Sequence, residues 1–132
     1  MLDYHRRQAV DVLAQATSVM LTTGGIAGLQ TSVLPCQAVE LNLYILVRQT
    51  SDHLANIENN PECVAVTDMW ELRGAAQRVP VSALPRLGLA KTPEAEWSAF
   101  ILVRPTRLQI ARPDGVGYAA TIDIDESTLK GD

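Results

Sequence analysis

The sequence has few of the features that mark disulfide scaffolds and zinc modules. It contains two cysteines, Cys36 and Cys63, and no CxxC pair. Each cysteine lies in an apolar stretch typical of a strand, so we expect reduced, buried thiols in a cytosolic protein, although the spacing also permits a bridge. The two histidines do not combine with these cysteines or with Asp52 at a spacing expected of a zinc site, so no metal is predicted.

Positive charge and long apolar runs are also scarce. The chain has 11 Lys and Arg against 15 Asp and Glu, which gives a net charge of -4. Because no basic field is present to attract a phosphate backbone, nucleic acid is not a predicted partner. No apolar run approaches the ~18 residues of a membrane span, and the N-terminal residues do not form a signal peptide. We therefore expect a cytoplasmic protein without a membrane partner.

The length and apolar content that are present fit one globular domain. The chain has 132 residues, of which 47% are hydrophobic, 20% charged and 5% aromatic. A chain of this size buries roughly two-thirds of the surface that its unfolded form exposes, so it needs neither disulfides nor a structural metal. The composition excludes disordered, collagen-like and coiled-coil proteins. The sequence therefore predicts a single domain over residues 1–132.

Hydrophobic spacing predicts an N-terminal helix followed by a β-hairpin. Between Asp3 and Ala16 the apolar residues recur at helical spacing, and Asp3 is a capping residue. The stretches 17–23 and 29–36 are interpreted as two antiparallel strands joined by a glycine-rich loop. The run 41–47 is almost continuously apolar, which predicts a central strand buried on both faces.

A short helix is predicted next, beginning near Ser51 and ending before Pro61. The stretches 63–67 and 72–79 indicate a second hairpin. Gly74 lies inside the second of these strands, where a glycine marks a bulge or the close approach of another group.

The last third of the chain is predicted to be mostly strand. Prolines punctuate residues 80–96, which are interpreted as a loop or a brief helix. Three further strands are predicted at 97–103, 107–111 and 118–124. The last two are joined across Asp114-Gly115, a strong turn dipeptide.

The predicted elements add up to a mainly β protein with two flanking helices. About eight strands occur, and no alternation of strand and helix demands a parallel sheet. A closed or partly closed antiparallel barrel also removes the exposed edges that so many apolar strands would present. The predicted fold class is therefore an antiparallel β-barrel.

Short motifs follow these elements in order along the chain. They are Thr22-Thr23, Thr31-Ser32-Val33, Leu43-Tyr44-Ile45-Leu46-Val47, Thr50-Ser51-x-His53-x-x-Asn56-Ile57-x-x-Asn60-Pro61, Val64-Ala65-Val66, Arg73-Gly74-Ala75-Ala76 and Phe100-Ile101-Leu102-Val103-Arg104-Pro105. In this order and spacing they resemble the pyridoxamine 5′-phosphate oxidase-like, FMN-binding split-barrel superfamily. Each motif alone is weak, and the resemblance covers nearly all of the chain.

The resemblance implies an antiparallel split barrel that forms a homodimer and binds FMN at the subunit interface. It places two groups of residues in the site: Thr31, Ser32, Val33 and Leu34 against the flavin ring, and Arg48, Thr50, Ser51 and His53 around the phosphate. The residue types agree, because a helix N-terminus, hydroxyl groups and a guanidinium together make an anion site. The implied activity is that of an oxidoreductase of unknown substrate, in which the cofactor supplies the hydride or electron chemistry. A homodimer also agrees with the apolar stretches 41–47 and 97–103, which a small barrel does not fully cover.

One departure from the superfamily keeps other functions open. Relatives that hold FMN firmly usually carry Lys or Arg where this chain has His53, and histidine is largely neutral at pH 7. This favours a second hypothesis, a split-barrel dimer that has lost tight FMN binding and takes haem or a deazaflavin, or acts as a non-catalytic binding module. A third hypothesis is a purely structural or interaction domain, because no residue of the sequence must act as an acid or base.

Three further side chains have both a structural and a functional interpretation. Trp70 and Trp97 could stack on a flavin ring, but packing in the core or at a dimer interface is the favoured role of each. Cys36 has no histidine nearby in the sequence, and a thiol in an apolar strand is usually structural, so it is not predicted as a nucleophile.

Overall fold

Two helices and seven strands make up the part of the chain that the computed structural model describes, residues 3–81, 97–114 and 116–124. In chain order they are α1 (Asp3–Ala14), β1 (Ser18–Thr23), β2 (Gln30–Val39), β3 (Asn42–Arg48), α2 (Asp52–Asn59), β4 (Glu62–Val66), β5 (Trp70–Pro80), β6 (Ser98–Ala111) and β7 (Tyr118–Asp123). Both predicted helices and both predicted hairpins are confirmed. Residues 82–96 of the predicted loop, and Gly115 of the predicted turn, lie outside the described residues.

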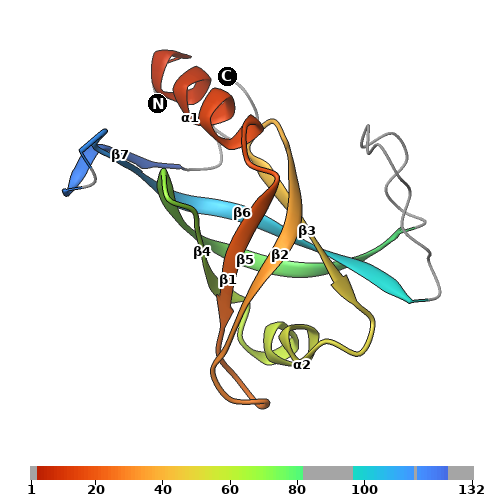
Figure 1. Ribbon diagram of the computed structural model, residues 1–132. Coiled ribbons are helices and arrows are strands. Elements are labelled where there is room, and N and C mark those ends of the chain that lie inside the picture. Colours follow the sequence, from red (N-terminus) through yellow and green to blue (C-terminus); the bar gives the residue numbers. More distant parts are fainter. Residues whose placement is uncertain (1–2, 82–96, 115, 125–132) are drawn as a thin grey trace.

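The strands form one antiparallel sheet that closes on itself. Their order is β3-β2-β1-β4-β5-β6-β7, and β3 also pairs with β6. The first six strands of this order therefore form a closed barrel, and β7 continues from β6 outside the ring (Figure 1). The prediction of an antiparallel β-barrel with two flanking helices is confirmed.

The prediction of two separate strands at 97–103 and 107–111 is wrong, because the single strand β6 covers both. Its first half pairs with β3 and its second half with β7, while β5 runs along its other edge. Pro105 lies between the two halves and is buried. It faces Gly74 where the register between β5 and β6 shifts. The proline therefore marks an irregularity within one strand rather than the end of a strand.

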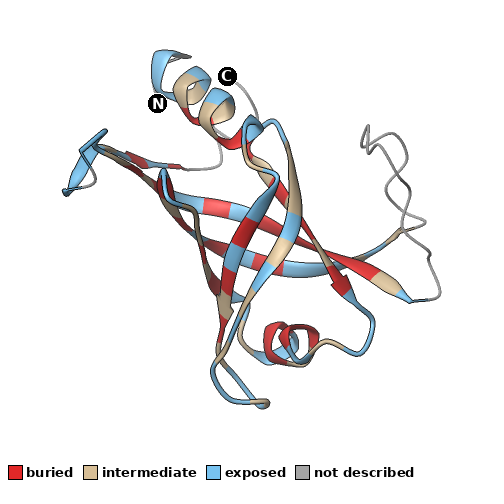
Figure 2. Cartoon of the chain, in the orientation of Figure 1, coloured by how far each residue is buried: buried red, intermediate tan, exposed pale blue. Residues whose placement is uncertain are grey.

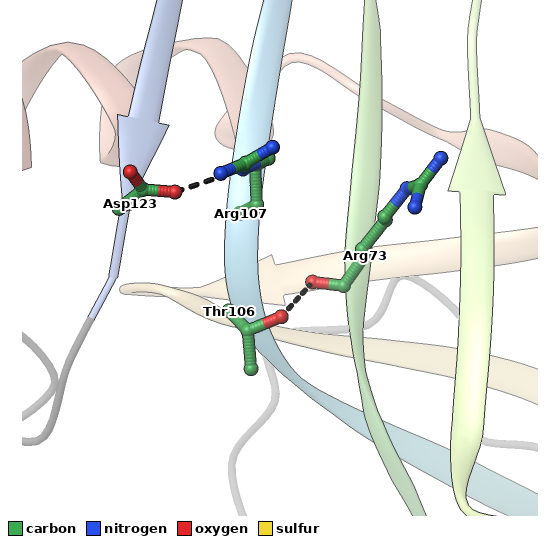
Figure 3. Close-up of polar contacts among 4 residues, drawn as sticks. All are labelled: Arg73, Thr106, Arg107 and Asp123. Atoms are coloured by element: carbon green, nitrogen blue, oxygen red, sulfur yellow. Dashed lines mark hydrogen bonds and ion pairs between the residues drawn. The ribbon is translucent and has the colours of Figure 1, made fainter.

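Gly74 has both of its predicted roles. The register shift lies between Arg73 and Gly74, and a Cβ atom at Gly74 would lie 2.5 Å from the carbonyl oxygen of Arg104. At the shift, Thr106 Oγ1 donates to Arg73 O of β5 at 3.2 Å, and the next residue of β6, Arg107, donates from Nε to Asp123 Oδ1 of β7 at 2.8 Å (Figure 3). Only a residue without a side chain allows β5 and β6 to approach this closely.

The barrel interior and the helices at its two ends hold the core. Helix α1 packs Ala9 and Leu13 against one end, and α2 packs Leu54 and Ile57 against the other (Figure 2). Between them, the strands bury alternate side chains, as expected where one face of a sheet lines a barrel. The apolar spacing that predicted the first helix therefore corresponds to the face by which α1 closes the barrel.

The prediction that 41–47 is buried on both faces is corrected by β3. Leu43, Ile45 and Val47 point into the core, whereas Tyr44 and Leu46 on the outer side are only half-buried. The strand is central in the sense that both of its edges are paired, to β2 and to β6. Its apolar character reflects the barrel interior and a partly covered outer face.

Replacing Gly74 by Ala should destabilise the barrel. The added methyl group must displace the backbone of Arg104 or the Val103 side chain, whose Cγ1 atom would lie at 2.9 Å. Overpacking of this kind costs about 1–3 kcal/mol of unfolding free energy. Urea denaturation measures the loss, with Gly24→Ala as the control because the nearest atom to a Cβ there lies at 4.0 Å. Equal stabilities of the two variants would contradict the close approach.

Candidate functional site

The barrel is split where β2 and β3 separate. Pairing between them is limited to Cys36–Val39 with Asn42–Ile45, and residues 30–35 of β2 pair only with β1 among the described strands. Beyond Ile45, β3 pairs with β6 alone. Alternate residues of an antiparallel strand direct their backbone N–H and C=O groups away from the partner strand. One edge of β2, at the predicted ring-binding residues, is therefore available to groups other than a strand.

The beginning of α2 is joined to this stretch of β2 by the side chains of His53 and Ser32. Ser51 is the N-cap, and its Oγ atom accepts a hydrogen bond from the backbone N–H of His53 at 3.2 Å. The N–H group of Leu54 is bonded to Ser51 O at 3.1 Å. Thr50 and the side chain of Arg48 are exposed beside this turn. The predicted phosphate residues therefore lie together. However, two of the first N–H groups of the helix are already hydrogen-bonded to Ser51, and Asp52 adds a carboxylate to the first turn.

His53, predicted to lie around the phosphate, is buried rather than exposed at the helix terminus. It is 3% exposed, and both ring nitrogens are hydrogen-bonded within the protein. Nδ1 lies 2.7 Å from Thr23 Oγ1 on β1, and Nε2 lies 3.0 Å from Ser32 Oγ on β2. The side chain thus joins α2 to both strands of the first hairpin.

Asn56, one turn further along α2, holds the glycine-rich loop. Its side chain is 0% exposed and makes three hydrogen bonds: it accepts from Ala27 N at 2.8 Å and donates to Gly28 O at 2.8 Å and to Thr23 Oγ1 at 3.1 Å. A Cβ atom at Gly25 would lie 3.0 Å from Asn56 O, so this loop position favours a glycine. Loop, helix and hairpin are therefore fixed relative to one another.

Burial sets the protonation of His53. Removal from water lowers its pKa below the ordinary value of 6.5, while the nearby Asp52 carboxylate acts in the opposite direction. Burial is the larger effect, because the ring is shielded and its partners on β1 and β2 are neutral hydroxyl groups. His53 is therefore neutral at pH 7 and adds no charge to a phosphate site in this state.

The four predicted ring-binding residues of β2 do not share one face. Thr31 and Val33 point outward and are exposed, whereas Ser32 and Leu34 point to the inner side and are half-buried. Thr31 Oγ1 lies 3.1 Å from Thr22 Oγ1 on β1. A planar ligand along this strand could meet the side chains of one pair only, together with the backbone edge described above.

A hollow of about 370 Å³ lies beside Thr22 on the outer face of the sheet. Leu29 and Val64 supply apolar surface, and Arg73 and Thr106 supply polar groups. Its volume is within the range of small-molecule sites. It could not be predicted from the sequence, because its lining comes from strands and loops that are distant along the chain.

The tryptophans and cysteines have different surroundings. Trp70 is 3% exposed and belongs to the core, which confirms its predicted packing role, whereas Trp97 is 65% exposed and does not. Both cysteines are free. Burial raises the pKa of the Cys36 thiol to about 11 and that of Cys63 to about 12, so neither is a thiolate at neutral pH.

Two residues that the sequence analysis did not assign to the site prove central to it, Thr23 and Asn56. The signal was present as the spacing of His53 and Asn56 on one helix, but their partners could not be identified from spacing alone. Among the described residues no group of three His, Cys, Asp or Glu side chains could hold a metal ion. In the same part of the chain no helix is long and apolar enough to cross a membrane.

Comparison with known proteins finds the same fold at low sequence identity. No protein-family model and no curated protein matches the sequence. General stress protein 26 of Bacillus anthracis matches with a TM-score of 0.67 and 16% identity, over 91% of this chain and 99% of that one. A related protein of the pyridoxine phosphate oxidase family from Clostridium acetobutylicum has a TM-score of 0.69 and 10% identity, over 98% and 99% of the two chains.

An F420 reductase also matches, with a TM-score of 0.58 and 20% identity, over 74% of this chain and 93% of that one. Together these similarities show that the chain has the split-barrel fold of pyridoxamine 5′-phosphate oxidase-like proteins. At such identities they extend to the fold and no further.

Lowering the pH below about 6.5 should destabilise the protein through His53. The unfolded chain binds a proton at the ordinary histidine pKa, while the folded chain resists it, so the unfolded state holds more protons in this range. His53 thus contributes full stability above the ordinary pKa and loses it as the pH falls through the folded value, by at most about 1.4 kcal/mol per pH unit.

Urea denaturation of the wild type and of His53→Gln between about pH 7 and pH 5 isolates this effect, since other titrating groups are common to both. The difference in unfolding free energy between the two proteins should shrink as the pH falls. A difference that does not change with pH would show that His53 is not held neutral.

Proposed function

We propose that the protein is a flavoprotein that binds FMN along β2 and at the start of α2, and that uses it in an oxidation-reduction reaction. The observation that carries the proposal is the split between β2 and β3. Among the described strands it leaves one backbone edge of residues 30–35 without a partner, and the first turn of α2 is joined to the same stretch of β2 through the bond between His53 and Ser32. An extended edge next to a helix N-terminus suits a ligand that has a planar ring at one end and a phosphate at the other.

The chain has groups that fit the phosphate. Arg48 and Thr50 are exposed at the turn, Ser51 retains a hydroxyl hydrogen after capping the helix, and the N–H of Asp52 begins the helix. Because Arg48 is the permanent cation of this set, it replaces the charge that relatives place at position 53. The Asp52 carboxylate opposes an anion, so we expect moderate rather than very tight affinity.

The residues near the ring position the cofactor rather than react with it. The N–H and C=O groups of β2 can bond the polar edge of a flavin, and Ser32 offers a hydroxyl group on the inner side, where it contacts His53 of α2. FMN, when bound, supplies the hydride or electron transfer. Neither cysteine is a thiolate, so covalent chemistry at sulfur is not part of the proposal.

A second candidate is a split barrel that binds a different ligand, such as haem or a deazaflavin, or that acts as a non-catalytic binding module. The neutral, buried state of His53 favours it, because that side chain cannot neutralise a phosphate. The similarity in fold to an F420 reductase also favours it, since F420 is a deazaflavin.

The colour of the purified protein distinguishes the two. A yellow protein that releases FMN on denaturation would support the first candidate, and a colourless protein that takes up no added FMN would exclude it.

The phosphate arrangement predicts a selective loss on removing two hydroxyl groups. Thr50→Ala together with Ser51→Ala should weaken FMN by roughly two orders of magnitude or more, because a hydrogen bond to a charged group contributes ~1.5–3 kcal/mol. Loss of the Ser51 cap should cost ~1 kcal/mol of stability and leave the fold intact. Fluorescence titration with FMN measures the change.

Riboflavin, which lacks the phosphate, is the ligand control, and its affinity should hardly respond. Thr121→Ala, at an exposed position of β7, is the protein control. If the double substitution weakened FMN and riboflavin equally, the phosphate would be held elsewhere.

We also propose a homodimer, on a different basis from the sequence argument. The barrel itself covers the inward residues of the apolar stretches 41–47 and 97–103; Ile45 and Ile101, for example, are 0% exposed. Exposed apolar side chains occur instead on the outer face of the first hairpin. Met20 and Val33 are paired across β1 and β2 and are 44% and 69% exposed. This face adjoins the proposed ring site, so a second copy would cover both.

Val33→Glu should therefore weaken the dimer, because a charge would be buried at its centre without a partner. Sedimentation velocity at micromolar concentration should show dimers for the wild type and monomers for the variant. Val116→Glu is the control, since Val116 is 71% exposed but lies in the turn before β7. A wild-type monomer would exclude the dimer and the interface site with it.

A further inference from the structure

Buried polar side chains connect α2 to β1 and β2 through a chain of hydrogen bonds. Asn56, Thr23 and His53 are 0%, 1% and 3% exposed. The chain runs from Asn56 Nδ2 to Thr23 Oγ1, from Thr23 Oγ1 to His53 Nδ1, and from His53 Nε2 to Ser32 Oγ. Buried polar groups must be paired, so the position of each hydrogen can be derived from the donors and acceptors around it.

The amide of Asn56 sets the direction of the first link. A backbone N–H can only donate, so the bond from Ala27 N at 2.8 Å identifies the side-chain oxygen of Asn56. The Asn56 nitrogen then donates to Gly28 O and to Thr23 Oγ1. The Thr23 hydroxyl accepts this bond, and its own hydrogen needs an acceptor. Within the described part of the chain, its other hydrogen-bond partner is Nδ1 of His53.

The Thr23 hydrogen in turn decides the tautomer of His53. A neutral imidazole that accepts at Nδ1 carries its hydrogen on Nε2. This hydrogen is donated to Ser32 Oγ at 3.0 Å. Ser32 therefore accepts a bond from inside the protein, and its own hydroxyl hydrogen remains to be donated to another group.

We propose that His53 is a positioning residue which, held as the Nε2–H tautomer by Thr23 and Asn56, makes Ser32 a hydrogen-bond donor to the bound ligand. The ligand side of this inference rests on the proposed function, in which Ser32 lies along the flavin site. It specifies that the Ser32 hydrogen is donated to an acceptor of the ligand, such as a carbonyl oxygen, an unprotonated ring nitrogen or a phosphate oxygen. His53 acts through Ser32.

Protonation of His53 would disrupt these donor and acceptor roles. An imidazolium donates from both nitrogens, so Thr23 Oγ1 would face donors from Asn56 and from His53, and its own hydrogen would lose its acceptor. The groups that face the ring from β1 and β2 are the hydroxyls of Thr23 and Ser32, which do not titrate in this range. On α2 itself, Asp52 is the charged group that favours the imidazolium, and burial outweighs it.

Nitrogen NMR of the histidine rings in the ligand-free, ¹⁵N-labelled protein tests the hydrogen positions directly. His53 should show the Nε2–H tautomer and should have a pKa below the ordinary value of 6.5, because burial lowers it. His5 on α1 is the chain's other histidine, so a His5→Gln variant assigns the two sets of signals. An Nδ1–H tautomer, or a His53 pKa at or above 6.5, would overturn the proposal.

Substitutions at Thr23 and Ser32 test the step from tautomer to ligand. Thr23→Val keeps the shape but removes the hydroxyl, so it should give mixed tautomers of His53 and weaken FMN roughly three- to tenfold, the range expected for one neutral hydrogen bond. Thr23→Ser restores the hydroxyl and should restore both properties. Ser32→Ala should weaken FMN to a similar extent and leave the tautomer unchanged, because Thr23 still fixes it.

The outcomes separate this proposal from the proposed function. If the wild type shows the Nε2–H tautomer but binds neither FMN nor riboflavin, the proposed flavin function is wrong, whereas the derived donor and acceptor roles are correct. If FMN binds and its affinity is the same in Ser32→Ala and Thr23→Val as in the wild type, the positioning role is overturned. The NMR measurement on the wild type decides the tautomer even if Thr23→Val does not fold.

Discussion

The pairing of β3 with β6 is the constraint on which the rest of the structure depends. Strand β6 offers one edge to β5 over its whole length and divides the other between β3 and β7. The first half closes the barrel, and the second half leaves it. A strand can serve two partners in this way only if it changes direction between them, and the change lies at the irregular register around Pro105 and Gly74. Closure removes the free edges that β3 and β6 would otherwise expose.

The candidate site lies where the barrel is split. Residues 43–45 of β3 pair with β6 on one edge and with β2 on the other, but beyond Ile45 the pairing with β6 alone continues among the described strands, so β3 separates from residues 30–35 of β2. Helix α2 begins near this stretch of β2, where His53 Nε2 bonds Ser32 Oγ, and a helix start carries polar groups that have to be bonded. Ser51 bonds one of them, and His53 and Asn56 provide the polar contacts to β1, β2 and the glycine-rich loop. The unpaired stretch of β2 therefore requires a polar network at one end of the apolar barrel, whatever ligand the protein binds.

Most of the fold could be predicted from sequence, and the errors have specific physical causes. Periodicity and turn residues located both helices and both hairpins, since those signals are local. Pro105 was interpreted as the end of a strand because the sequence does not show that a glycine of β5 lies opposite it. The burial of His53 could not be predicted because its partners, Thr23 and Ser32, are 30 and 21 residues away along the chain. Local reasoning could find the hydroxyl groups at the helix start, but it could not tell which polar side chains face water and which face each other.

The attachment of the glycine-rich loop to α2 has a consequence for how the molecule opens. Gly25, Ile26 and Leu29 are exposed, and an exposed loop of this kind would ordinarily exchange its amide hydrogens with solvent at once. Here the N–H of Ala27 is bonded to Asn56 and that of Gly28 to Gly25 O, while Asn60 bonds Gly24 O. The Ala27 amide can exchange only when its bond to Asn56 breaks, and the carbonyls of Gly24 and Gly28 are released by the same step, so loop and helix make up one cooperative unit of local unfolding. The outermost hairpin tip of the barrel is thus as stable as its attachment to the helix.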